Sequence, residues 1–263
     1  MIVIDRNKCT GCGVCAQLCL AKAVAVKNGF AEIRRDCFMC GHCAAACPAG
    51  AVRIDGDGYS ADEAFPYDPD EKILSPEQVM RYIRTRRSVR LFRDEPVPDE
   101  VLRQLVEAGR FSPTASNAQN VSYIVLKDSL PDFNRLAMRE FRSLRGDEQA
   151  FAAIFPPPFS LSRVDFDDDD FLFKGARAVI FCLSPSDVNA AIAAAHMELL
   201  AVSLGYGAVY SGFAVRQLAG TPSLRARLGL REAERAAVCL CLGRPAVRFY
   251  RTVSRKKPAA KWL

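Results

Sequence analysis

The stretch CTGCGVCAQLC at residues 9–19 recurs as CFMCGHCAAACP at residues 37–48. Each copy spaces its cysteines as Cys-x2-Cys-x2-Cys-x3-Cys, so three thiolates lie on one tight loop and a fourth follows them. This run is typical of iron–sulfur sites, in which the fourth cysteine binds the other of two clusters. Structural zinc sites usually use paired Cys-x2-Cys units without a third close cysteine. The repeat therefore predicts two iron–sulfur clusters rather than zinc.

The cysteine count also indicates the redox compartment. The chain has 11 cysteines among 263 residues, and eight of them belong to the repeat. The N-terminus MIVIDRNKC lacks the charged and long apolar segments of a secretory signal. This predicts a reducing, cytoplasmic setting in which disulfides do not persist. The other three cysteines lie in apolar runs and are expected to be small buried side chains: Cys182, Cys239 and Cys241.

Charge and hydropathy argue against two classes of partner. The net charge is only +6, which does not require a nucleic-acid partner. The longest apolar stretch, residues 190–202, is interrupted by His196 and Glu198 and is too short for a transmembrane helix. We therefore expect neither nucleic-acid binding nor membrane insertion.

The chain is predicted to divide into a small metal domain at residues 1–58, a linker at 59–74 and a larger domain at 75–263. The linker, YSADEAFPYDPDEKIL, carries five acidic residues and two prolines. This composition favours an extended connection.

The larger domain is predicted to mix helices with strands. Ser75, Pro76 and Gln78 have the N-cap, first-turn proline and capping box of a helix start. Asp99 is expected to open a second helix that ends at Gly109. Further helices are predicted at 189–204 and 221–229, and buried strands at 121–126, 178–183 and 236–242. Residues 142–174 combine three prolines, an acidic run and many phenylalanines, which favours a packed flap or lid over a solvated loop.

A cluster of arginines at Arg86, Arg87 and Arg90, with Ser88 between them, allows three interpretations. It is a solvated basic face, a nucleic-acid contact or a phosphate site in which guanidinium groups pair with phosphate oxygens. Composition alone leaves these open.

Residues 1–58 resemble the bacterial two-[4Fe–4S] ferredoxins, because both cysteine runs match and the second ends in Cys47-Pro48. The resemblance implies that one cluster is bound by Cys9, Cys12, Cys15 and Cys47. It implies that the other is bound by Cys37, Cys40, Cys43 and Cys19.

Residues 75–263 resemble the nitroreductase family of FMN enzymes. The resemblance rests on RRSVR at 86–90, SPTASNAQN at 112–120, GYGAVYSG at 205–212, LGRP at 242–245 and RKKP at 255–258. It implies an α+β fold with a central mixed sheet flanked by helices. It also implies a homodimer with two FMN sites, each built from both subunits.

The same resemblance assigns residues to the FMN. Arg86, Ser88 and Arg90 match positions that hold the phosphate, ribityl chain and pyrimidine edge. Arg87, which is also assigned to the cofactor, matches a position that is often His or Arg. Pro113, Thr114 and Asn117 match the segment from the other subunit, and Ser211 and Gly212 match the turn beside the flavin. One of three terminal residues matches a phosphate ligand, and the choice among them stays open: Arg255, Lys256 or Lys257. The sequence QNV at 119–121 departs from the Gln-Pro-aromatic run common in the family.

Together, these expectations predict an FMN-dependent oxidoreductase that receives electrons through two [4Fe–4S] clusters. Its predicted substrate is a small electron-poor molecule such as a nitroaromatic, quinone or enone. The external donor is a ferredoxin or NAD(P)H. The alternative is an electron-transfer module that serves a partner protein and has no small substrate of its own. No acid–base catalyst is indicated by the sequence.

Overall fold

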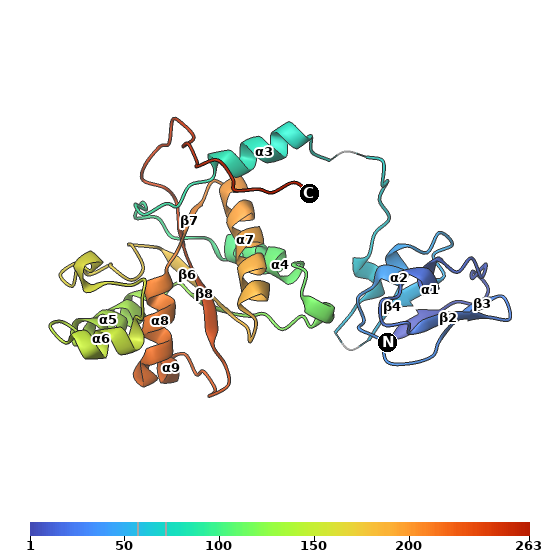
Figure 1. Cartoon of the computed structure of the whole chain (residues 1–263), viewed down its shortest axis with the longest axis horizontal. Coiled ribbons are helices and arrows are strands. Elements are labelled where there is room, and N and C mark those ends of the chain that lie inside the picture. The colour runs from blue at the N-terminus through green and yellow to red at the C-terminus, as the bar shows by residue number, and fades with distance from the viewer. Residues whose placement is uncertain (57, 72) are drawn as a thin grey trace. The chain divides into compact units, whose positions relative to one another are not determined.

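The computed structural model of the protein describes residues 1–56, 58–71 and 73–263 (Figure 1). The chain forms two compact units. One comprises Met1–Ile73 together with Thr114–Ala118, and the other comprises Leu74–Pro113 with Gln119–Leu263. We call them the cysteine unit and the sheet unit, and each is described by itself.

The cysteine unit repeats one local structure at both cysteine runs. Helices α1 (Val14–Leu18) and α2 (His42–Ala45) each begin after a glycine with positive φ, Gly13 at 81° and Gly41 at 76°. A left-handed backbone lets the chain turn tightly at this position, which glycine adopts without a steric penalty. The two halves of the sequence repeat therefore fold alike.

Two pairs of antiparallel strands accompany these helices. Strand β1 (Ile2–Ile4) pairs with β4 (Val52–Ile54), and β2 (Val24–Lys27) forms a hairpin with β3 (Phe30–Ile33). The hairpin turns at Asn28 and Gly29, whose φ values of 51° and 81° suit a tight two-residue connection. The unit has a small core in which cysteines pack with aliphatic side chains: Cys15, Val24, Ala31, Cys43 and Val52. A short 3-10 turn, η1 (Ala61–Glu63), follows within the predicted linker.

In the sheet unit, helix α3 (Pro76–Thr85) starts as predicted. The Ser75 side chain accepts a hydrogen bond from Gln78 N–H, and the Gln78 side chain accepts one from Ser75 N–H. Helix α4 (Asp99–Arg110) also starts where expected. The prediction that Gly109 ends α4 is wrong, because the helix continues through it. A Cβ on Gly109 would lie 2.3 Å from Met197 Cε, so this glycine allows close helix packing.

The central sheet has the strand order β5–β6–β8–β7, with antiparallel neighbours: β5 (Ser122–Leu126), β6 (Ala178–Leu183), β8 (Ala236–Gly243) and β7 (Gly207–Tyr210). A parallel bridge from Ser88 to Ala208 makes the sheet mixed. Strands β6 and β8 are buried as predicted. The prediction of a buried strand at 121–126 is only partly right, since β5 lies at the edge of the sheet and is half-exposed.

Helices cover both faces of the sheet (Figure 1). Alternate residues of β6 face opposite cores, with Ile180 in one and Phe181 in the other. The Ile180 core includes α4 and α7 (Asp187–Ser203), which begins two residues before the predicted range because Ser186 is its N-cap. The Phe181 core is covered by four helices: α5 (Leu130–Arg142), α6 (Glu148–Ile154), α8 (Gly212–Gly220) and α9 (Pro222–Arg227). Cys182, Cys239 and Cys241 are buried, as predicted.

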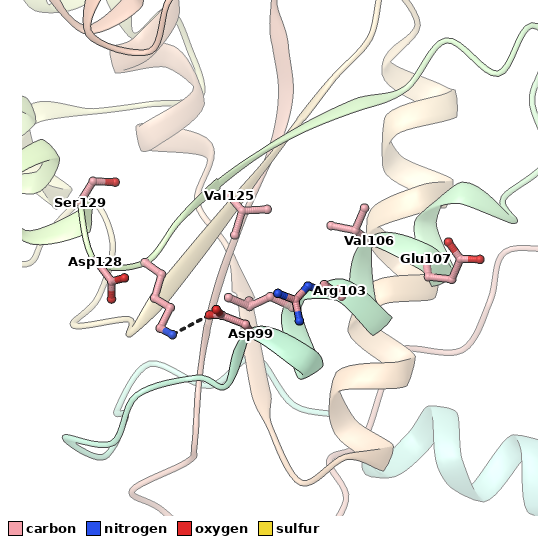
Figure 2. Close-up of a pocket in the computed structure, with 9 residues that line it drawn as sticks. Asp99, Arg103, Val106, Glu107, Val125, Asp128 and Ser129 are labelled. Carbon is pink, nitrogen blue, oxygen red and sulfur yellow. Dashed lines mark hydrogen bonds and ion pairs between the residues drawn. The ribbon is translucent and has the colours of Figure 1, made fainter. Parts of the chain in front are cut away.

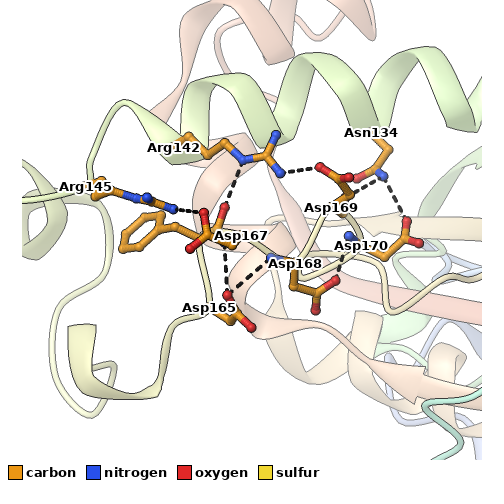
Figure 3. A network of polar contacts seen from close by, with 9 residues as sticks. Asn134, Arg142, Arg145, Asp165, Asp167, Asp168, Asp169 and Asp170 are labelled. Carbon is orange, nitrogen blue, oxygen red and sulfur yellow. Dashed lines mark hydrogen bonds and ion pairs between the residues drawn. The ribbon is translucent and has the colours of Figure 1, made fainter.

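Residues 142–174 are packed rather than solvated, as the phenylalanines predicted. The ring of Phe141 stacks on that of Phe171 at a centroid distance of 5.3 Å and meets that of Phe155 edge-on. The acidic run forms its own ion pairs (Figure 3). Arg142 pairs with Asp169 and Arg145 with Asp167, while the Asn134 amide donates to Asp170. These contacts fix the loop on the end of α5.

A short 3-10 turn, η3 (Leu161–Arg163), lies in the irregular segment between α6 and β6 of the sheet unit. Within the described ranges, no helix combines the length and apolar character needed to cross a membrane.

Candidate functional site

A small cavity in the cysteine unit is lined by four thiols. Cys9, Cys12 and Cys15 come from the first run, and Cys47 comes from the end of the second. Apart from Thr10, the rest of the lining is glycine or small apolar side chains, so the thiols are the principal chemical groups of the cavity wall: Gly11, Gly13, Val14, Val26, Ala31, Ala49 and Val52. This combination is the set that the ferredoxin resemblance assigns to one cluster.

Backbone N–H groups point at the cysteine sulfurs in both halves of the repeat. Ala23 N–H donates to Cys19 Sγ at 3.1 Å, and Ala51 N–H donates to Cys47 Sγ at 3.2 Å. Sulfurs of the leading cysteines accept similar bonds, Cys9 from Ala31 at 3.4 Å and Cys37 from Met39 at 3.3 Å. Such bonds favour the thiolate form and help to set the potential of an iron–sulfur cluster.

Burial acts on two of the thiols in the opposite direction. It raises the pKa of Cys15 and that of Cys43 above the ordinary value. These two cysteines occupy matching positions at the starts of α1 and α2. In the described part of the chain, no three His, Cys, Asp or Glu side chains gather closely enough to hold a single metal ion.

The cysteine unit includes one segment from much further along the chain, Thr114–Ala118. The Asn117 side-chain amide donates to the backbone carbonyl oxygens of Phe38 and Met39, both at 3.0 Å, and lies 3.4 Å from the Tyr59 hydroxyl. Phe38 and Met39 separate Cys37 from Cys40. The segment that resembles part of a flavin site therefore holds the loop between two of the predicted cluster ligands.

Both sides of this contact use a left-handed backbone. The φ values are 52° at Ser116, 54° at Asn117 and 53° at Met39. For residues other than glycine, this conformation costs on the order of 1–3 kcal/mol and persists where surrounding contacts enforce it.

In the sheet unit, the arginine-rich segment lies along strand β7. Ser88 forms a parallel bridge with Ala208, and Val89 N–H donates to Ala208 O at 2.9 Å. Further along, Arg93 N–H donates to Arg244 O at 2.8 Å. These bonds give the backbone of residues 88–93 a defined path on the sheet, and so they position Ser88 and Arg90.

A pair of glycines makes this path possible. Gly207 of β7 and Gly243 of β8 are register partners. A Cβ on Gly207 would lie 2.4 Å from Val89 Cγ2, and one on Gly243 would lie 2.8 Å from Phe92 Cδ1. The side chains of Val89 and Phe92 thus occupy the space that side chains at the two glycines would need.

Arg86 pairs with a carboxylate that the sequence did not single out as functional. Its Nη1 lies 2.7 Å from Glu198 Oε1, and the Tyr210 hydroxyl lies 3.3 Å from Glu198 Oε2. The Glu198 side chain is only 7% exposed. Burial and the neighbouring Glu198 raise the pKa of Tyr210 above its ordinary value. The sequence signal that could have identified Glu198 was an acidic residue inside the mainly apolar stretch at 190–202.

Lys174 is a second residue that sequence reasoning missed. Partial burial, and then the nearby Arg90 guanidinium, lower the pKa of Lys174, while acidic neighbours including Asp168 act against this shift. Its Nζ also lies 3.9 Å from the centroid of the Phe171 ring. An anion that binds between the exposed Arg90 and the partly buried Lys174 would be stabilised by both charges.

The remaining predicted flavin residues are placed as follows. The Ser211 hydroxyl donates to Leu172 O at 2.6 Å and caps α8 by accepting from Ala214 N–H at 3.2 Å. Gly212 opens α8. Arg87 is half-buried beside Arg86, while Pro113 is exposed and Thr114 belongs to the cysteine unit. The terminal residues are exposed and outside regular structure: Arg255, Lys256 and Lys257.

A larger groove lies elsewhere in the sheet unit (Figure 2). It measures about 580 Å³ and lies between α4 and the edge strand β5. Lys127 and Asp99 form an ion pair of 2.6 Å across it, and this contact lowers the pKa of Asp99. The residues that line it were not predicted as flavin ligands: Asp99, Leu102, Arg103, Val106, Glu107, Val125, Lys127, Asp128 and Ser129.

Comparison with known proteins identifies relatives of both units. Residues 1–48 match the 4Fe-4S dicluster domain, and residues 83–157 match the Nitroreductase family. The FMN reductase [NAD(P)H] of Bacillus subtilis is 30% identical over 144 residues, which are 51% of this chain and 54% of that protein. The chain therefore spans about half the length of this relative.

Solved structures share the fold of the sheet unit. A nitroreductase with bound FMN from Bacteroides fragilis superposes with a TM-score of 0.56 at 19% identity, covering 71% of this chain and 98% of that one. A nitroreductase with bound FMN from Desulfitobacterium hafniense gives a TM-score of 0.55 at 22% identity, covering 70% and 97%. The predicted α+β nitroreductase-like fold is confirmed. The chain therefore resembles a 4Fe-4S dicluster domain over residues 1–48 and the nitroreductase family over residues 83–157.

Proposed function

We propose that this protein is an FMN-dependent oxidoreductase whose flavin receives electrons through two [4Fe–4S] clusters. Its substrate is a small electron-poor organic molecule of the nitroaromatic, quinone or enone type. The observation that carries the proposal is the presence, in one chain, of a cysteine cavity with N–H···S contacts and an arginine segment held against β7. The first suits a cluster and the second suits a phosphate-bearing cofactor.

The chemistry of the cysteine unit fits its proposed groups. Four thiols line one cavity, and N–H donors approach sulfurs from both runs. We assign one cluster to Cys9, Cys12, Cys15 and Cys47. The other is assigned to Cys19, Cys37, Cys40 and Cys43.

Two cations of the sheet unit, Arg90 and Lys174, lie near each other where the FMN is proposed, with acidic side chains such as Asp168 beside them. Arg90 and the partly buried Lys174 are close enough for Arg90 to lower the pKa of Lys174. A phosphate or the electron-rich edge of a flavin would relieve this repulsion. We assign the FMN environment to Arg86, Arg87, Ser88 and Arg90, to Ser211 and Gly212, and, in a homodimer, to Pro113, Thr114 and Asn117 of the second subunit. One of Arg255, Lys256 and Lys257 completes it.

A bound flavin accepts electrons singly or in pairs and passes a hydride to a substrate. The residues of this chain have other tasks. The arginines bind and orient the cofactor, and the backbone bonds to Ala208 and Arg244 hold their segment in place. The Asn117 contact keeps the Cys37–Cys40 loop in a fixed conformation.

The test starts from anaerobically purified protein. Iron, sulfide and flavin are quantified, and the visible spectrum is expected to show flavin bands over broad cluster absorption. Reduced ferredoxin, NADH and NADPH are then compared as donors against a panel of nitroaromatics, quinones and enones. Zinc without iron would overturn the cluster assignment. Flavin that is reduced but passes electrons only to a protein acceptor would favour an electron-transfer module.

A further inference from the structure

Glu198 is the buried carboxylate of helix α7. The rest of this helix is rich in alanine and packs against the sheet through apolar side chains such as Ala194, Met197 and Ala201. Removing a carboxylate from water costs several kcal/mol, and a single ion pair often does not recover that cost. Fold stability alone therefore does not account for Glu198 at this position.

The partners of Glu198 come from two segments of the proposed flavin site. Arg86 follows the last residue of α3, and its backbone N–H donates to Tyr82 O. Tyr210 ends strand β7 and directly precedes Ser211. The carboxylate receives Arg86 on Oε1 at 2.7 Å and the Tyr210 hydroxyl on Oε2 at 3.3 Å. One side chain of α7 thus ties the start of the arginine segment to the end of β7.

The contact leaves most of the Arg86 guanidinium available. Arginine has five N–H donors. Among the residues that the structure describes, its side chain makes one hydrogen bond, from Nη1 to Glu198. The side chain is 24% exposed, so it is accessible from solvent. A guanidinium held by one edge in this way keeps its other donors in a fixed direction, which reduces the conformational entropy lost when an anion binds.

We propose that Glu198 is a positioning residue that orients Arg86 toward the phosphate of FMN. Through this role it determines the preference for FMN over riboflavin, which has the same ring and ribityl chain without the phosphate. The inference rests on the proposed flavin function. Glu198 itself acts only through Arg86.

The experiment compares FMN with riboflavin on flavin-depleted, cluster-loaded protein, with binding followed by flavin fluorescence. Arg86→Ala is expected to weaken FMN binding by roughly 10- to 150-fold, as for one lost charge-assisted hydrogen bond, and to leave riboflavin binding unchanged. Glu198→Gln keeps the side-chain shape and one oxygen but removes the charge. It is expected to lower the FMN-to-riboflavin affinity ratio in the same direction.

The double variant provides the decisive comparison. If Glu198 works through Arg86, Arg86→Ala with Glu198→Gln binds FMN no more weakly than Arg86→Ala alone. Glu107→Gln is the matched control, because it removes the carboxylate from the exposed Glu107–Arg110 pair of α4. Its affinity ratio is expected to equal that of the wild type.

Three results would overturn the inference. They are an unchanged ratio in Glu198→Gln, an equal loss of FMN and riboflavin binding, or additive losses in the double variant. If Glu198→Gln does not fold, Glu198→Asp, which retracts the carboxylate, must lower the ratio instead. Wild-type protein that binds no FMN would contradict the proposed function itself, whereas FMN binding that is independent of Glu198 would contradict only this inference.

Discussion

The side-chain amide nitrogen of Asn117 lies 3.0 Å from the backbone carbonyl oxygen of Met39. Met39 belongs to the loop between Cys37 and Cys40, and both Met39 and Asn117 have a left-handed backbone. The contact is local to the cysteine unit, although Asn117 follows Met39 by a long stretch of chain. It therefore makes the conformation of a predicted cluster loop depend on a residue from the segment that matches the nitroreductase family.

The first prediction concerns this contact. Asn117→Ala removes hydrogen bonds to the carbonyl oxygens of Phe38 and Met39, which loosens the loop by on the order of 1–3 kcal/mol. We expect full iron content but slower reduction of the bound flavin by reduced ferredoxin, measured by stopped-flow absorbance. Asn120→Ala is the control, because the Asn120 side chain accepts from Asn189 in the sheet unit. Equal rates in wild type and Asn117→Ala would contradict the role of the contact.

The second prediction concerns the cluster assigned to Cys19, Cys37, Cys40 and Cys43. Cys40→Ser replaces an exposed thiolate by a poorer iron ligand. We expect disturbed electron paramagnetic resonance of this cluster, retention of FMN, and loss of flavin reduction by ferredoxin. Direct reduction of the flavin by dithionite should persist. A Cys40→Ser protein that accepts electrons from ferredoxin as fast as the wild type would show that electrons do not need this cluster.

The third prediction concerns Arg90. Arg90→Ala removes a cation from the proposed flavin site and is expected to weaken FMN binding by about 1.5–3 kcal/mol. The loss of Arg90 also removes one of the influences that lower the pKa of Lys174, so that pKa should rise. Titration of flavin-depleted protein with FMN measures the first effect. Unchanged affinity and full flavin content after purification would refute the assignment.

The fourth prediction concerns Gly109. Gly109→Ala places a Cβ 2.3 Å from Met197 Cε and 2.7 Å from the Tyr123 hydroxyl. Overpacking of this kind costs about 1–3 kcal/mol, whereas alanine gains about 1 kcal/mol of helix propensity. We expect net destabilisation of about 1 kcal/mol, seen as a lower melting temperature by circular dichroism. In a Met197→Ala background the same change should cost less, and an equal cost there would argue against this clash.

The fifth prediction concerns alkaline pH. Burial raises the pKa of Cys182 to about 12, whereas an unfolded thiol titrates near 8.5. Above about pH 8.5 the unfolded state loses this proton and the folded state keeps it, so stability falls by up to ~1.4 kcal/mol per pH unit until the folded pKa is reached. Cys182→Ala lacks this contribution. As the pH rises from about 8 to about 11, the melting temperature of the wild type should therefore fall toward that of Cys182→Ala. A difference between the two melting temperatures that stays constant over this range would contradict the raised pKa of Cys182.

Local features of the sequence predicted the parts of the fold that depend on neighbouring residues. The capping box at Ser75 and Gln78 needs only residues three apart, and the fully buried β6 needs only a continuous apolar run. The cysteine repeat likewise predicted a tight loop in each half, and the two halves fold alike. Each of these structures follows from covalent spacing and short-range hydrogen bonds.

Features that depend on distant residues were not predicted. The Arg86–Glu198 pair joins side chains more than a hundred residues apart, and each residue had a local interpretation of its own. Gly109 was expected to end a helix, because glycine is common at helix ends. Its close contacts with Met197 and Tyr123 could not be foreseen, since those residues lie on other elements. Similarly, an apolar run does not reveal that β5 is an edge strand, because sheet order depends on the whole chain.

The glycine pair at Gly207 and Gly243 leaves room for the segment that carries the proposed flavin ligands Ser88 and Arg90. Val89 and Phe92 approach these glycines so closely that a methyl group on either would push the intervening backbone outward. Arg90 lies between those two side chains and would move with them. A neutral substitution at either glycine would thus yield a folded protein whose visible spectrum has lost the flavin bands and keeps only the broad cluster absorption.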